Sequence, residues 1–177
     1  MSWTSLTGGG RKNSRAGSPA TVLPEAEDVE AATQRHAIVS TTRFGDLEID
    51  QERVITMTAP FWGFPGSTRF FLQSHSGNSP LMWLQSIDDP ALAFVVVPPA
   101  VIDREFKPPI TGPVRKELGI DRDGDLDVLV ILTVPAGRPR EMTANLLAPV
   151  VINVRKRLAK QVLLDPVQYD PCWPVFG

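Results

Sequence analysis

Cysteine and histidine, which supply many catalytic groups and soft metal ligands, are almost absent from this chain. Its one cysteine is Cys172, and its two histidines are His36 and His75. A single thiol excludes an intrachain disulfide, and a zinc site needs three or four Cys or His ligands at workable spacing. We therefore expect no metal site and no resident cofactor, and we interpret Cys172 as a passive residue.

Long apolar runs and an excess of positive charge are also missing. No stretch approaches the roughly 20 apolar residues that a membrane helix needs, and the N-terminus lacks the apolar core of a secretory signal. The formal net charge is −2, which gives no electrostatic case for binding nucleic acid. Together with the single cysteine, these absences indicate a cytoplasmic protein that binds neither a membrane nor nucleic acid directly.

The sequence contains no complete motif for nucleophilic catalysis, calcium binding or phosphate binding. Serines flank His75, but neighbours along a loop do not face each other, and no nucleophile elbow is present. Asp121–Asp127 alternates carboxylates as a calcium loop does, yet the glycine and glutamate of that loop are misplaced, so we interpret it as an acidic turn. Gly63–Gly66 lacks the lysine and the helix of a phosphate loop. This inventory favours a binding protein over an enzyme.

The chain divides into a tail and a β-rich domain. Residues 1–38 are rich in Ser, Thr, Gly and Pro, with scattered apolar residues and an acidic end, so we expect a disordered or weakly helical tail that is dispensable for folding. A short helix within this tail is possible over residues 24–36. Residues 39–177 form the predicted domain.

Short β-branched and aromatic runs recur from Ile38 onward, each closed by Gly, Pro, Asn or Asp. Without long helical patterns between them, they predict a mainly β fold, a small antiparallel β-barrel-like domain with one or two short helices. The predicted strands are Ile38–Thr42, Leu47–Ile49, Val54–Met57, Arg69–Gln73, Met82–Ser86, Ala93–Val97, Leu126–Val134, Leu147–Val154 and Ala159–Leu164.

Several connections are specified by their residues. Phe64-Pro65-Gly66 predicts a type II turn, and the dipeptide Asp88-Asp89 before a proline predicts a hairpin turn. Pro113–Leu118 predicts a short helix that ends at Gly119. Residues 147–164 predict a C-terminal hairpin with its basic tip at residues 155–157, and Ile152 among its buried positions.

Candidate partner-binding residues are polar or aromatic rather than nucleophilic. Asp88 and Asp89 occupy a predicted exposed turn, and Phe61-Trp62 precede a Gly-Pro loop where they could form contact area or core. Four amides lie in apolar strands, and they either satisfy backbone groups at bulges and strand ends or face a partner. These amides are Gln85, Asn145, Asn153 and Gln161, of which Asn145 and Gln161 are our contact candidates.

Seven segments, in order over residues 41–173, resemble the FliW family of flagellar assembly factors. Each is weak alone, but their shared order is specific. The segments are Thr42–Gly45, Gly63–Gly66, Leu84–Pro90, Ala93–Val97, Thr143–Pro149, Ile152-Asn153 and Lys160–Leu164. The tail lies outside the resemblance, and Ser67-Thr68 stand where the family commonly has an aromatic–acidic pair.

The resemblance implies a small β-barrel without enzymatic activity. Proteins of this family bind the translational repressor CsrA and relieve its repression of flagellin mRNA. They also bind flagellin, which displaces CsrA, so the two partners alternate. An acidic protein without a catalytic centre is consistent with a basic RNA-binding partner. The alternatives are a generic β-barrel interaction module and a small-molecule barrel, which would need a roomy apolar interior.

Overall fold

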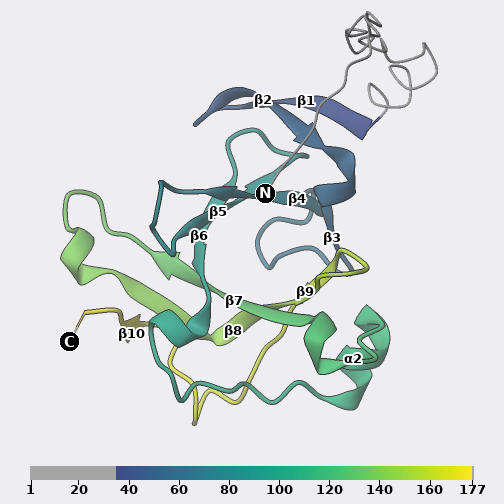
Figure 1. The fold of residues 1–177 in the computed structure, drawn as a ribbon. Helices are drawn as coiled ribbons and strands as arrows, with labels where there is room; N and C mark the ends of the chain where they lie inside the picture. Colours follow the sequence, from purple (N-terminus) through teal and green to yellow (C-terminus); the bar gives the residue numbers. More distant parts are fainter. Residues whose placement is uncertain (1–34, 177) are drawn as a thin grey trace, which may run out of the picture. The chain divides into compact units, whose positions relative to one another are not determined.

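A computed structural model describes residues 35–176 of the chain, and these residues form a closed β-barrel with one α-helix and an added hairpin (Figure 1). The mainly β fold predicted from the sequence is confirmed. The barrel strands are β3 (Ile55–Met57), β4 (Arg69–Ser74), β5 (Met82–Ser86), β6 (Ala93–Val97), β7 (Leu126–Thr133), β8 (Thr143–Asn153) and β9 (Leu158–Gln161).

The barrel closes where β9 pairs with both β8 and β3. Each strand from β3 to β8 pairs with the next one antiparallel, and β9 pairs antiparallel with β8 but parallel with β3. The predicted antiparallel barrel is thus antiparallel at every neighbouring pair except this one. A ring with an odd number of strands cannot alternate direction at every step, so at least one neighbouring pair must be parallel.

The barrel interior is filled by apolar side chains from all of its strands. Period-2 alternation turns every second residue inward, so Phe70 is buried inside the barrel while Phe71 packs outside it. The interior cluster comprises Ile55, Met57, Phe70, Leu84, Val96, Leu129, Val150, Ile152 and Ala159, with Phe61 from a loop. This filled interior leaves no support for the small-molecule barrel that we considered as an alternative.

Strand β8 begins at Thr143, four residues before the predicted strand. Its pairing with β7 is interrupted, because Leu129 pairs with Val150 whereas Ile131 pairs with Asn145. Four residues of β8 thus oppose one residue of β7, and this bulge bends β8 toward β9. The short C-terminal strand β10 (Trp173–Pro174) pairs with the first residues of β8, on the edge opposite β7.

The helix α2 (Gly112–Leu118) confirms the predicted helix and its end at Gly119, which has φ of 62°. Asn153 fixes this end to the barrel with its whole amide group. Its Nδ2 donates to the carbonyls of Leu118 and Gly119, each at 2.9 Å, and its Oδ1 accepts from the backbone N–H groups of Arg155 and Lys156. This buried amide therefore joins the helix to the turn between β8 and β9.

A two-stranded hairpin, β1 (His36–Thr41) and β2 (Gly45–Asp50), packs on the outer face of the barrel. Val39 and Ile49 bury against Phe71 of β4. β1 begins at His36, so residues 36–38, which we assigned to the tail, lie in this strand. The remainder of that tail, including nearly all of its possible helix, lies outside the described residues. In the described part of the chain, no helix is long and apolar enough to span a membrane.

Candidate partner-binding site

An exposed aromatic loop lies beside the acidic turn between β5 and β6, and we call residues 61–67 and 86–90 together the corner. The loop places Trp62 and Phe64 at the surface, with 59% and 39% of their area exposed. A hollow of about 460 Å³ separates the loop from the turn, and it is lined by Gly63, Phe64, Pro65, Gly66, Ser67, Asp88, Asp89 and Pro90.

Two consecutive turns shape the aromatic loop. The N–H of Phe64 donates to the carbonyl of Phe61 at 2.9 Å, and the N–H of Ser67 donates to the carbonyl of Phe64 at 3.1 Å. The positive φ of 88° falls on Gly63 in the first turn, whereas Gly66 has no positive φ. The predicted type II turn at Gly66 was therefore wrong, because the left-handed position that a type II turn requires lies three residues earlier.

Phe61 anchors the loop from below rather than contacting a partner. It is buried against Phe70 and Phe94, with ring centroids 5.2 and 4.8 Å away. Of the two interpretations that we left open for Phe61, contact area or core, its burial at the end of the barrel interior fits the core. Phe64 packs edge-on against the same Phe94 at 5.4 Å. The shared contacts with Phe94 thus anchor the loop on both sides of Trp62.

Asp88 binds the start of β4 with both oxygens of its carboxylate. Its Oδ2 accepts from the backbone N–H groups of Thr68 and Arg69, each at 2.8 Å, and its Oδ1 accepts from Nε of Arg69 at 2.8 Å. Only 15% of its side chain is exposed. The carboxylate thus joins two segments about 20 residues apart, and a contact of Asp88 with a partner stays a prediction.

The pKa of Asp88 reflects a balance between burial and these bonds. Burial alone would raise the pKa of the carboxyl, because it disfavours the charged form. The two backbone N–H donors and the guanidinium of Arg69 outweigh that effect, so the pKa lies below its usual value. Asp88 is therefore an ionised side chain that joins the turn to the start of β4.

Asp89 and the serines complete the turn. Ser86 Oγ accepts from the N–H groups of Asp88 and Asp89, and it donates to Oγ of the buried Ser67 at 3.3 Å. Asp89 is exposed, and among the residues that the structure describes its carboxylate accepts only from the N–H of Ala91 in its own turn. Among the predicted acidic contacts, Asp89 thus keeps a carboxylate at the surface beside the aromatic loop.

The predicted contacts Asn145 and Gln161 lie elsewhere, at the bulge of β8. Asn145 Oδ1 accepts from the N–H of Ala148 at 2.9 Å, and Gln161 Nε2 donates to the carbonyl of the same residue at 3.3 Å. Together they satisfy the backbone of one bulged residue, which agrees with the structural interpretation of the strand amides. Sequence reasoning brought them to our notice but could not show that they share a target.

Phe64 was missed as a candidate, although its place between two glycines was a usable signal. Gln85 has a buried amide that donates to the carbonyls of Ser86, Pro90 and Leu92, which fixes the turn from inside.

The Asp121–Asp127 segment is the predicted acidic turn, in which Asp125 is buried beside Arg122 and Arg155. The described residues hold no group of three Cys, His, Asp or Glu side chains arranged for a metal ion.

The fold defines a small closed β-barrel with a filled interior and an exposed aromatic corner. A family model described as FliW protein matches residues 38–175. The chain therefore belongs to the FliW family. It is similar to the flagellar assembly factor FliW of Magnetococcus marinus, with 37% identity over 134 residues, covering 76% of this chain and 82% of the relative.

Two further comparisons cover a similar share of the chain. The flagellar assembly factor FliW of Syntrophus aciditrophicus is 38% identical over 136 residues, which cover 75% of this chain and 85% of that protein. A crystal structure described as that of the flagellar assembly factor FliW matches with a TM-score of 0.73 and 33% identity. The match covers 80% of this chain and 98% of that structure. Fold and sequence thus indicate the same family.

Proposed function

We propose that this protein is a non-enzymatic flagellar assembly factor of the cytoplasm that binds CsrA and flagellin in alternation. The family membership supports a role in flagellar assembly, since the relatives are named flagellar assembly factors. The CsrA and flagellin partners follow from the resemblance described above. Flagellin awaiting export holds the factor, and its secretion frees the factor to sequester CsrA.

The observation that carries the binding role is the exposed Trp62 on a braced loop. A tryptophan at the centre of a protein interface contributes more binding energy than most residues, because it buries a large area with few rotatable bonds. The loop is held by Phe61 from below and faces a turn held by Asp88. Because these residues are already ordered, little further entropy is lost when a partner binds.

The charge of the corner suits a basic partner. Asp89 is exposed at the rim of the hollow, and a rim carboxylate accelerates association with a positively charged protein more than it strengthens the complex. A single corner used by both partners would account for their alternation, since two proteins cannot occupy the same aromatic contact at once.

Titration of purified flagellin into a preformed complex with CsrA tests this proposal. We expect flagellin to release CsrA, and we expect Trp62→Ala to weaken CsrA binding by about tenfold or more. Asp89→Lys should slow association, with the largest effect at low salt, where charges are least screened. Asp127→Lys, a matched charge reversal at an exposed position of β7, should leave both partners unaffected.

Two results would contradict the proposal in different ways. A ternary complex that retains CsrA at saturating flagellin would overturn the alternation of partners. Unchanged affinity of Trp62→Ala for both proteins would remove the corner as the site and leave the family role in place. Circular dichroism of each variant establishes that the barrel is intact before binding is compared.

A further inference from the structure

Strand β1 offers an unpaired backbone edge. It pairs with β2 along its whole length, and no other strand of the described residues pairs with it. Half of the N–H and C=O groups of such a strand point away from its partner, where they can pair with another chain. The usual protections of an edge are missing, since His36–Thr41 contains no proline, no lysine and no bulge.

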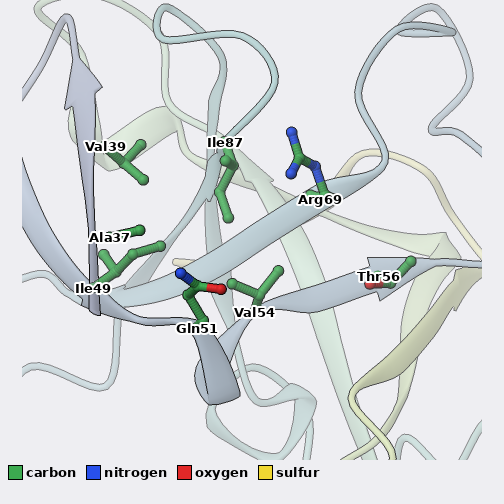
Figure 2. A pocket seen from close by; sticks show the side chains of 8 residues that line it. All are labelled: Ala37, Val39, Ile49, Gln51, Val54, Thr56, Arg69 and Ile87. Atoms are coloured by element: carbon green, nitrogen blue, oxygen red, sulfur yellow. The ribbon is translucent and has the colours of Figure 1, made fainter. Parts of the chain in front are cut away.

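A groove lies under the inner face of this strand (Figure 2). It measures about 420 Å³, and β1 contributes both Ala37 and Val39 to it. Figure 2 shows these side chains facing Ile87 and Arg69 of the barrel across the open space. Because side chains alternate along a strand, a strand added to the edge of β1 would direct every second side chain into this groove, which is lined by aliphatic side chains together with Gln51, Thr56 and Arg69.

The outer face of the hairpin has a different character. Ile38 is 76% exposed, and its cross-strand neighbour is Glu48. Ser40 donates to the carboxylate of Asp46, its own cross-strand neighbour, at 2.7 Å. A lysine or arginine on an added strand could lay its methylene groups over Ile38 and bring its charge toward Glu48, two strand spacings or about 9.6 Å away.

We propose that the edge of β1 binds an extended segment of a partner protein in which apolar residues alternate with lysine or arginine. The backbone edge provides the hydrogen bonds, the groove receives the apolar residues, and the carboxylates of β2 favour the basic ones. A second copy of this chain is disfavoured as the occupant, because its own edge strand His36–Thr41 contains no lysine or arginine that the carboxylates of β2 could favour.

This site lies on the hairpin and goes beyond the proposed function, and of the residues that define the corner only Ile87 lines its groove. Two of the nearby positive or titratable side chains have partners of their own. Arg43 stacks on the ring of Trp83 at 4.2 Å, and His36 pairs with Glu48 at one end of the hairpin. The carboxylates of Asp46 and Glu48 therefore lie beside the middle of β1, opposite Ser40 and Ile38.

A fluorescent peptide of six residues, the length of β1, tests the proposal with the full-length protein. The probe alternates valine and lysine and is blocked at both ends. We expect saturable binding by fluorescence polarisation, and we expect replacement of its lysines by glutamate to weaken binding by about tenfold.

N-methylation of the peptide distinguishes backbone pairing with β1 from non-specific binding. In an extended strand, the N–H groups of alternate residues point to opposite edges. Methylating all the valines and methylating all the lysines give matched probes, of which only one set can face β1. We expect one set to lose binding and the other to keep it. Equal loss, or no loss, in both sets would overturn the proposal.

Variants of the protein locate the site. Ile38→Lys and Ile38→Glu remove the same apolar side chain, so only the lysine should reduce binding of the basic probe strongly, by about tenfold. Ala37→Leu should fill the groove and reduce binding, while Trp62→Ala should not change it. If no variant of β1 alters binding, the site is wrong. If sedimentation shows a dimer that Ile38→Lys dissociates, a second copy is the occupant and the proposal fails.

These outcomes are independent of CsrA and flagellin, because the probe is a synthetic peptide. Failure of the peptide to bind leaves the corner and its partners untouched. Failure of the corner to bind CsrA likewise leaves the edge of β1 available for test.

Discussion

At the residue scale, the buried polar side chains act mainly as connectors of backbone. Asn153, Gln85 and Asp88 each bind several backbone groups, and their targets come from other segments or from the turn that follows. Sequence reasoning identified Asn153 and Gln85 as notable because amides are unusual in apolar strands. It could not identify their role, because their hydrogen-bond partners depend on how distant segments meet.

Asp88→Asn tests the connection that this side chain makes between the turn and β4. Because folding lowers the pKa of Asp88, its charge stabilises the protein fully above the unfolded value of about 3.9. That contribution is lost as pH falls through the lower pKa of the folded state. We expect the substitution to reduce the free energy of unfolding by about 1–3 kcal/mol at pH 7, with the difference shrinking below about pH 4.

Urea denaturation at several pH values measures this difference. Asp89→Asn is the matched control, since within the described part of the chain its carboxylate accepts only one bond, in its own turn, and is exposed. A constant difference between wild type and Asp88→Asn from neutral to strongly acidic pH would show that the ionised carboxylate is not what stabilises the turn.

At the element scale, the strands with clear turn residues at both ends were predicted best. Met82–Ser86 and Ala93–Val97 match the structure residue for residue, because Asp88, Asp89 and Pro90 mark the turn between them. The start of β8 was missed, since Ala144 and Asn145 have low strand propensity and the bulge breaks the alternation. There the tertiary pairing with β7 and β10 outweighs local preference.

Ile152→Ala tests the packing of the β8–β9 hairpin. Ile152 is buried in the barrel interior, so its truncation should reduce the free energy of unfolding by about 2–5 kcal/mol. Leu163→Ala, in the segment that follows β9, is the control, because 58% of Leu163 is exposed and we expect a change of about 0.5 kcal/mol or less. Equal effects of the two substitutions in chemical denaturation would contradict the inward orientation of Ile152.

At the scale of the whole molecule, the sequence predicts the class of fold but not the strand pair that closes the barrel. Many short strands indicated a barrel or sandwich, but no local signal marks the parallel pairing of Thr56 with Leu158. The hairpin of β1 and β2 was foreseen as two strands, yet its place outside the barrel depends on Phe71, whose outward direction follows from the register of β4.

Two truncations test where the folded domain begins. Because residues 1–34 have the composition of a tail, we expect their deletion to leave the melting temperature within about 3 °C. Deletion of residues 1–41 removes β1 and uncovers Ile49 and Phe71, so we expect a fall of about 10 °C. Differential scanning calorimetry decides. A large fall with the shorter deletion would place residues before Arg35 in the domain.

The contact between β3 and β9 also governs when the protein can fold. These strands are paired although they lie about one hundred residues apart in the chain. During synthesis, β9 leaves the ribosome long after β3. Until then β3 can pair with β4 but not with β9. Contacts of such large separation are associated with slow folding. The nascent protein is therefore exposed to aggregation at this open edge of β3 until β9 has been made.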